Sequence, residues 1–476
     1  MVRRDKLVER IGREARLAFE QGKYSDMAVK QGLDLRISRV SEAASETLQF
    51  PESQRFRDEL EYMDSLKQFL DSLEPESPQK RHDGICSNPN LGDFIESSAR
   101  RDLEGMVSRF NPFLFNLYVS TLAKWKYRHI LKNIQVEEEN PGQTIDNLKT
   151  YAGKEPMIVV ANHCSNVDHV VLGMTLHRYR ITMPLIQAGS NLAQGKSKKY
   201  LPLLGAYLVD RSRLGRDGKI DLLYAYNRSV MRQDNITCLL LQNEFFQAGR
   251  SYDGSFPGNH HMTHEPKRFD SSLVGDARSV ERRTDRPVRV QMVTFTYSWV
   301  PEAEMLMRHY LAKETVPDTN LMREWEEFNR FFGDYESGEF PIVMYIHEPR
   351  PLQDFAPEEG GAASYTKKMA EAIGKAVYVL PVPLAAMAFQ DECSYYRVVD
   401  EFIRLRNELL ENGARLHPSL RPQIRDARYK DLEPVFYQAI KTHQKAGIID
   451  YEHPRINVKN RHVFDFMVNS LAHLSQ

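Results

Sequence analysis

The run MIVVANHCSNVDHVVLG constrains this chain most, because an apolar segment breaks into polar text and then resumes as a helix. MIVVAN is a short, uninterrupted apolar run, which predicts a buried strand. VDHVVLGMTLHRY then predicts a helix. The polar gap between them holds His163 and Asp168, with four residues between the two. A strand-to-helix junction at the edge of a sheet is where α/β folds place reactive groups.

Apolar β-rich runs and helical text alternate from Pro156 onward. We expect strands in MIVVAN, TMPLIQAG, GAYLVDR, NITCLLLQN, VRVQMVTFTY and FPIVMYIHEP. Helical text lies between them in KIDLLYAYNRSVMRQ, EAEMLMRHYL and NLMREWEEFNRFF, and KKMAEAIGKAVYVLP follows the last strand. This order predicts an α/β domain with a central sheet, over about residues 105–395. The polar text between Ser255 and Pro287 predicts a long loop.

The two ends of the chain differ from this domain. Residues 1–100 predict an N-terminal helical region, in which Leu66, Phe69, Leu70 and Leu73 fall on one helical face. Residues 396–476 predict a charged, C-terminal helical extension. The segment from Asn111 to Lys132 is aromatic at its start and basic at its end, a composition that suits a membrane surface or an ordinary buried helix with a wet end.

Charge and cysteine content exclude several classes of protein. Lys and Arg number 64 against 65 Asp and Glu, which argues against a globally basic nucleic-acid binder. The four cysteines are scattered and predict neither a disulfide framework nor a zinc site. The N-terminus lacks the apolar core of a signal peptide. The run Ala376 to Phe389, AVYVLPVPLAAMAF, is too short to span a bilayer and carries two prolines.

His163 and Asp168 together suit general base catalysis. A neutral imidazole takes a proton from a hydroxyl, and a carboxylate on its other nitrogen fixes the tautomer and stabilises the imidazolium. A substrate that brings its own hydroxyl needs no protein nucleophile. Cys164 and Ser165 are alternative nucleophiles, without the glycines of a nucleophile elbow. His163, Asp168 and His169 are an alternative metal set that lacks an evident third firm ligand.

Cationic groups follow this pair along the chain. Arg211 comes at the end of a predicted strand, and FFQAGRSYDG supplies a glycine that lets the backbone approach a ligand, an arginine and a serine: Gly249, Arg250 and Ser251. Lys267 adds a further cation. Arginine suits bidentate contact with phosphate. The order of these groups behind the His–Asp pair indicates a site for an anionic substrate that carries a hydroxyl.

These motifs resemble those of the glycerolipid acyltransferases, the superfamily that acylates glycerol-3-phosphate and lysophosphatidate. Four blocks agree in order and spacing: NHCSNVD with the family's NHxxxxD, AYLVDRS with its phosphate-binding arginine, FFQAGRSYDG with FxEGxRSRxG, and VRVQMVTFTY with VPVxxxY. IQAGSNL, EPKRF, IVMYIHEPRPLQDF and AVYVLPVPLAAMAF are similar to linking segments of the glycerol-3-phosphate or dihydroxyacetone-phosphate branch. The resemblance covers about residues 105–395.

The resemblance implies a fold and a reaction. The fold would be a central mixed sheet flanked by helices, as in glycerol-3-phosphate acyltransferases. His163 would be the general base and Asp168 its orienting partner. Arg211, Gly249, Arg250, Ser251 and Lys267 would hold the phosphate of glycerol-3-phosphate. The co-substrate would be acyl-CoA or acyl carrier protein, with no metal or other cofactor and no nucleic acid. The protein would be peripheral, at the cytoplasmic face of a membrane.

Two departures from the family pattern keep other readings open. Gln247 and Ala248 stand where the third block has Glu-Gly, and Gln291 stands where the fourth block has proline. They bear on the identity of the acceptor, for which dihydroxyacetone phosphate and lysophosphatidate are the alternatives. A non-catalytic relative that binds lipid or acyl carrier protein is a further alternative.

Overall fold

The computed structural model describes residues 112–123, 128–152, 154–162, 164–165, 167–181, 184–189, 201–209, 238–243, 272–284, 286–300, 303, 341–356, 362–389, 392–471 and 474. The predicted N-terminal helical region and the predicted helices over KIDLLYAYNRSVMRQ, EAEMLMRHYL and NLMREWEEFNRFF lie outside the described residues, apart from the isolated Ala303. The described residues fall into two compact units.

The larger unit draws on Asn116–Pro184, Leu240–Arg278 and Pro287–Gln476 and holds the main sheet. Its strands are β1 (Ile134–Glu138), β2 (Met157–Asn162), β6 (Arg289–Tyr297), β7 (Ile342–Ile346) and β8 (Arg350–Pro351). Strand β6 pairs in parallel with β2 and antiparallel with β7 and β8, while β7 pairs in parallel with β1. β5 (Cys238–Asn243) follows β2 in the strand order. The sheet is therefore mixed, as predicted.

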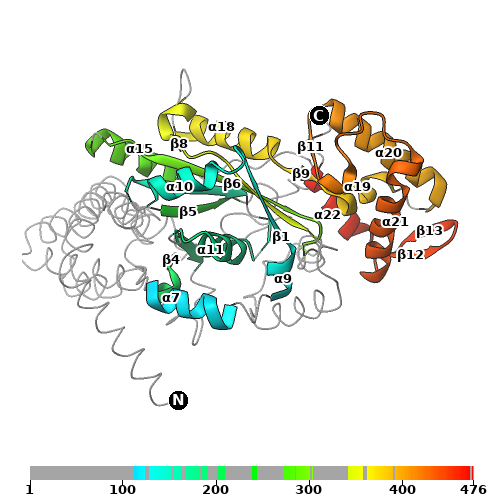
Figure 1. The fold of residues 1–476 in the computed structure, drawn as a ribbon, viewed down its shortest axis with the longest axis horizontal. Coiled ribbons are helices and arrows are strands. Elements are labelled where there is room, and N and C mark those ends of the chain that lie inside the picture. Colours follow the sequence, from blue (N-terminus) through cyan, green and yellow to red (C-terminus); the bar gives the residue numbers. More distant parts are fainter. Residues whose placement is uncertain are drawn as a thin grey trace, which may run out of the picture. The chain divides into compact units, whose positions relative to one another are not determined.

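Helices cover both faces of this sheet. Figure 1 shows α18 (Ala362–Lys375) on one face and α11 (Asp168–Arg178) on the other. Every residue of β2 and β7 is buried. A strand covered on both faces must be apolar throughout, which explains why MIVVAN and IVMYI read as continuous apolar runs rather than as alternating ones. The α/β class and the expected strands are confirmed at this level.

Two shorter helices, α9 (Arg128–Asn133) and α10 (Thr144–Tyr151), flank the sheet.

The loop predicted between Ser255 and Pro287 is wrong in its second half, which forms the helix α15 (Ser272–Thr284). Val274, Ala277 and Val280 are fully buried there. Their spacing of three residues places them on one face of the helix. This face has so few apolar residues that the helical pattern is not visible in a segment that is otherwise polar.

The smaller unit contributes β3 (Leu185–Gly189) and β4 (Ala206–Val209), which pair in parallel. A 3-10 turn, Pro202–Leu204, precedes β4 and ends at Gly205, whose φ of 102° lies in the left-handed region that glycine adopts without strain. Both strands coincide with the predicted runs TMPLIQAG and GAYLVDR.

The C-terminal part contains α19 (Pro381–Ala388), α20 (Tyr395–Glu411), α21 (Tyr429–Lys445) and α22 (Arg461–Leu471). Helix α19 packs against the other three (Figure 1). It is apolar on all sides and almost wholly buried, as a central helix must be. The apolar run Ala376 to Phe389 thus supplies the short strand β9 (Tyr378–Val379) and this helix.

The C-terminal extension, predicted as helical, contains short strands beside its helices. A small antiparallel sheet joins β10 (Glu392–Ser394), β13 (Arg455–Val458) and β12 (Ile449–Glu452). A further two-residue strand, β11 (Arg415–Leu416), pairs in parallel with β9. Strands of two to four residues are too short to leave a readable period in the sequence. The predicted domain boundary at residue 395 stays a prediction.

The aromatic and basic segment from Asn111 to Lys132 forms α7 (Pro112–Tyr118), a π-helical turn (Val119–Ala123) and α9. Within this segment, Trp125, Lys126 and Tyr127 lie outside the described residues. Leu117 is 45% exposed. In the described parts of the chain, no helix is both long enough and apolar enough to cross a membrane. The membrane contact of this segment stays a prediction.

Candidate active site

The turn between β2 and α11 carries the predicted His–Asp pair. Strand β2 ends at Asn162, and Asp168 is the first residue of α11. Of the predicted site residues, Asp168 is described. The others lie outside the described residues: His163, Arg211, Gly249, Arg250, Ser251 and Lys267. The geometry of the site is therefore built from Asp168 and from the residues on either side of His163 in the sequence.

The carboxylate of Asp168 is buried, with the residue only 1% exposed, and it fastens the turn. Its Oδ2 accepts hydrogen bonds from the backbone N–H groups of Cys164, at 2.7 Å, and Ser165, at 3.0 Å. A carboxylate in the first turn of a helix is also favoured by the helix dipole. Asp168 therefore fixes the two residues that immediately follow His163.

The other carboxylate oxygen of Asp168 is held from a different strand. The Tyr297 hydroxyl, at the end of β6, donates to Asp168 Oδ1 at 2.5 Å. A hydrogen bond from a hydroxyl to a carboxylate is among the strong ones in proteins. Since β2 and β6 are parallel neighbours, their carboxyl ends meet at one edge of the sheet, and Tyr297 reaches α11 there.

Tyr297 is a site residue that sequence reasoning missed. It is the final residue of the fourth block, VRVQMVTFTY, and 129 positions separate it from Asp168. The signal that could have identified Tyr297 is its position at the end of a buried strand parallel to β2. A hydroxyl at that position lies close to the turn after β2. That signal requires knowing that the two strands are neighbours, which one sequence does not reveal.

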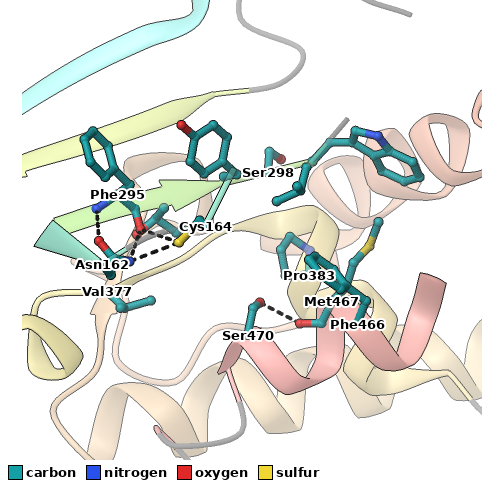
Figure 2. Close-up of a pocket in the computed structure, with 13 residues that line it drawn as sticks. Asn162, Cys164, Phe295, Ser298, Val377, Pro383, Phe466, Met467 and Ser470 are labelled. Carbon is teal, nitrogen blue, oxygen red and sulfur yellow. Dashed lines mark hydrogen bonds between the residues drawn. The ribbon is translucent and has the colours of Figure 1, made fainter. Parts of the chain in front are cut away.

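Asn162 secures the other end of the turn. Its side-chain Oδ1 accepts from the backbone N–H of Phe295 at 2.7 Å, and its Nδ2 donates to the Phe295 carbonyl at 2.8 Å. Nδ2 also lies 3.1 Å from Cys164 Sγ. Figure 2 shows these contacts as dashed lines. The amide extends the β2–β6 ladder by one side chain, beyond the last backbone pair at Ala161 and Val293.

The two alternative nucleophiles, Ser165 and Cys164, both have hydrogen-bond contacts close to the turn. Ser165 is fully buried, and its Oγ accepts from the Val167 backbone N–H at 3.4 Å. Cys164 is 9% exposed, with Sγ beside the Asn162 amide and 3.7 Å from the Phe295 carbonyl. Among the described residues, no group of three or more His, Cys, Asp or Glu side chains is placed to hold a metal ion.

Gln291, the departure in the fourth block, is buried within β6. Its Nε2 donates to the carbonyl of Met292 at 2.8 Å and to that of His347 at 2.7 Å. It therefore ties β6 to the segment that follows β7. The residue has a bonding role in the sheet away from Asp168, so the departure leaves the geometry around the turn intact.

His347 is a buried histidine behind the site rather than a second base. Its Nε2 lies 3.0 Å from the Thr294 hydroxyl. Burial, together with the positive charges of Arg415 and Arg350, lowers the pKa of His347 to about 3. The imidazole is therefore neutral near pH 7 and serves as a hydrogen-bonding group.

The neighbouring acid Glu348, in the same IHEP segment, holds the start of α10. Its Oε2 accepts from the Thr144 hydroxyl at 2.9 Å, and its Oε1 accepts from the Asn147 amide. Glu139 Oε2 accepts from the Glu348 backbone N–H at 2.8 Å. The IHEP segment thus acts as a structural link between β7, β1 and α10.

Part of the chain is similar to known proteins. Residues 133–241 match the family described as Acyltransferase. The chain is 28% identical over 156 residues to glycerol-3-phosphate acyltransferase 1, mitochondrial, of Bos taurus. It is 27% identical over 156 residues to the protein of the same name from Homo sapiens. Each match covers 32% of this chain and only 18% of the relative's length.

The family match begins near the start of β1 and includes β2, the turn and α11. The turn fastened by Asp168 therefore belongs to the part of the chain that is similar to known acyltransferases. Over this segment the chain is similar to the acyltransferase family, and the two relatives that it matches are glycerol-3-phosphate acyltransferases. The predicted resemblance is confirmed at this level.

Proposed function

We propose that this protein transfers a fatty acyl group from acyl-CoA, or from acyl carrier protein, to the sn-1 hydroxyl of glycerol-3-phosphate. One observation carries the proposal. The buried Asp168 carboxylate takes hydrogen bonds from Cys164, Ser165 and Tyr297 and so fixes the turn that contains His163 in the sequence. A base that must meet a hydroxyl in one geometry needs such a fixed frame.

The reaction follows from these roles. His163 takes the proton of the acceptor hydroxyl while the hydroxyl oxygen attacks the thioester carbonyl carbon. The carbonyl becomes a tetrahedral oxyanion, which then expels the thiolate as the carbon–sulfur bond breaks. The imidazolium of His163 returns the proton to the thiolate. Asp168 favours the charged imidazolium electrostatically, as the carboxylate of a catalytic triad does.

The acceptor's phosphate is assigned to the cations that follow the turn in sequence. Arg211, Arg250 and Lys267 supply positive charge, and Gly249 and Ser251 supply close backbone approach and a hydroxyl donor. Since the third block has Gln247 and Ala248 in place of Glu-Gly, dihydroxyacetone phosphate and lysophosphatidate are the second candidate acceptors. Long acyl chains reside in membranes, so we place the reaction at a membrane surface, with the protein peripheral on its cytoplasmic face.

An acceptor panel tests this proposal. Purified protein receives labelled palmitoyl-CoA, or palmitoyl-acyl carrier protein, with glycerol-3-phosphate, dihydroxyacetone phosphate or lysophosphatidate in separate reactions, and the labelled products are identified. We expect 1-acylglycerol-3-phosphate as the main product. A preference for another acceptor would reassign the substrate within the superfamily. An absence of transfer to all three acceptors from both donors would favour a non-catalytic lipid-binding protein.

A further inference from the structure

The last residues of β6, Phe295–Tyr297, hold the turn after β2 at both of its ends. The Phe295 backbone exchanges two hydrogen bonds with the side chain of Asn162, the final residue of β2 (Figure 2). The Tyr297 hydroxyl donates to Asp168, the first residue of α11. Backbone pairing between β2 and β6 ends before this point. The position of the turn therefore depends on where the end of β6 lies.

Thr296 lies between these two contacts and faces the other way. Successive side chains of a strand alternate, so Thr296 projects from the face of the sheet opposite to that of Tyr297. Its hydroxyl oxygen accepts a hydrogen bond from the backbone N–H of Tyr378 at 3.1 Å, and Thr296 is only 7% exposed. Tyr378 begins β9, which follows α18 along the chain. This bond thus joins β9 to the residue of β6 that lies between the two contacts with the turn.

Strand β9 is itself fixed by the C-terminal part of the chain. It pairs in parallel with β11 and leads directly into the buried helix α19. The backbone N–H of His417 donates to the Val379 carbonyl at 3.0 Å, and His417 Nε2 lies 2.8 Å from Gln135 Oε1 on β1. The Arg415 guanidinium lies over the Tyr345 ring of β7, 4.3 Å from its centre. These contacts make β9 a firm support for the end of β6.

The size of the effect follows from what remains when the Thr296 hydroxyl is removed. The N–H of Tyr378 loses this acceptor, and the end of β6 loses its tie to β9. Strand β7 still pairs with β6 as far as Tyr297, so the strand stays in the sheet and its displacement is small. One hydrogen bond changes an equilibrium about two- to twelvefold. Small displacements of reacting groups are costly, because a shift of about 1 Å can reduce a rate about 100-fold.

We propose that Thr296 is a positioning residue for the acyl transfer. Through its bond to Tyr378, the C-terminal part holds the end of β6, and this end holds the turn that contains His163 in the sequence. The inference rests on the proposed function, because His163 needs a fixed place only if it is the base. Thr296 acts through Asn162 and Tyr297 rather than through contact with a substrate. The C-terminal part of the chain thereby supports the active site.

Three variants test this role. Thr296→Val keeps the shape of the side chain and removes the acceptor, whereas Thr296→Ser keeps the hydroxyl. Thr294→Val is the matched control, since Thr294 is buried two residues earlier on the same face and bonds to His347 Nε2. We expect Thr296→Val to lower kcat about fivefold with KM unchanged. Thr296→Ser should keep most of the wild-type kcat. Thr294→Val should lose stability but keep the wild-type kcat per folded molecule.

Three outcomes of these measurements would overturn the inference. The first is a folded Thr296→Val variant with the wild-type kcat. The second is an equal loss of kcat in Thr294→Val, which would make the effect a general one of buried hydroxyls on this face. The third is a loss in Thr296→Ser as large as that in Thr296→Val, which would assign the effect to packing rather than to the hydrogen bond.

Amide hydrogen exchange tests the same role without turnover. The N–H groups of Cys164 and Ser165 bond to Asp168, so their exchange reports opening of the turn. We expect exchange in the peptide that contains them to be about fivefold faster in Thr296→Val and unchanged in Thr294→Val. Wild-type exchange in Thr296→Val would overturn the inference. If the wild type transfers to no acceptor but the exchange difference is found, the support of the turn stands and the proposed function fails.

Discussion

The turn at the end of β2 and the C-terminal helices each bury an ionisable side chain, and they use it differently. Asp168 is 1% exposed and binds backbone N–H groups and the Tyr297 hydroxyl, all around one short turn. Arg406 on α20 is fully buried and donates to the carbonyls of Leu420, Arg421 and Arg425. The first arrangement fixes the turn after β2, and the second fixes a loop.

The comparison teaches that burial alone does not mark a functional residue. Both side chains satisfy backbone groups that would otherwise lack partners. What separates them is the segment that they hold. Asp168 holds the residues next to His163, whereas Arg406 holds the connection between α20 and α21, far from the turn in sequence. Substitutions should therefore affect activity in one region and stability in the other.

The largest expected effect is that of Asp168→Asn. The amide cannot accept as strongly from Cys164, Ser165 and Tyr297, and it removes the negative charge that stabilises the imidazolium of His163. We expect kcat to fall by about 10³- to 10⁴-fold, by analogy with the loss of a triad carboxylate. Asp146→Asn, an exposed acid in the first turn of α10, is the control that should keep full activity. Equal rates for wild type and Asp168→Asn would remove Asp168 from the mechanism.

Arg406→Met should mainly reduce stability. It removes the Arg406 donor from the carbonyls of Leu420, Arg421 and Arg425, of which Arg421 keeps the N–H of Ile424. Each buried polar group that loses its partner costs about 1–3 kcal/mol. We expect the free energy of unfolding to fall by about 3 kcal/mol, with little change in activity per folded molecule. The control, Arg404→Met, breaks exposed ion pairs to Glu401 and Glu408 and should cost less than about 1 kcal/mol. Chemical denaturation measures the free energy of unfolding of both variants. Comparable losses of this free energy in the two variants would contradict the predicted difference.

Acid should destabilise the C-terminal region through His443. This residue is fully buried, its Nε2 lies 3.0 Å from the Val382 carbonyl, and it stacks on Phe464. Burial lowers the pKa of His443 to about 4, against 6.5 for an unperturbed histidine. The unfolded chain therefore binds a proton that the folded chain excludes, and stability is lost as pH falls from about 6.5 to 4.

Denaturation at several pH values measures this effect. His443→Leu should lower stability at pH 7 by about 1 kcal/mol, because the Val382 carbonyl loses its donor. Its pH dependence between about 4 and 6.5 should be shallower by up to about 1.4 kcal/mol per pH unit, the contribution of one proton. An identical slope in the variant and the wild type would show that His443 does not resist protonation.

Tyr297→Phe should have a much smaller effect on activity than Asp168→Asn. It removes the hydroxyl from Asp168 Oδ1 and leaves both backbone donors to Oδ2 in place. We expect kcat to fall about tenfold with KM unchanged, which corresponds to about 1.4 kcal/mol. Tyr437→Phe, on the exposed face of α21, is the control. A change in KM alone would indicate a substrate contact instead.

The sequence predicted the parts of the site that are local. An apolar run that breaks at Asn162 and resumes at Asp168 carries its own signal, so β2, the turn and α11 were predicted correctly. The mixed sheet followed from the resemblance. The roles of His163 and of the phosphate-binding residues stay predictions, since they lie outside the described residues.

The features that the sequence did not predict depend on long-range contacts or on short elements. Tyr297 reaches Asp168 across 129 positions, and α22 meets the end of β6 after a far longer separation than any periodic pattern can report. The sheet of β10, β12 and β13 has strands of three or four residues, which are below the length at which alternation is legible. Packing, rather than local propensity, decides each of these features.

The central claim is that the turn after β2 positions His163 as the base of an acyltransferase. The most direct test measures transfer of labelled palmitate from palmitoyl-CoA to glycerol-3-phosphate by wild type and His163→Ala, in detergent or vesicles. Thermal unfolding of both proteins confirms that each is folded. The account predicts formation of 1-palmitoylglycerol-3-phosphate by the wild type and its loss, by at least about 10²-fold, in the folded variant. Undiminished transfer by His163→Ala would contradict it.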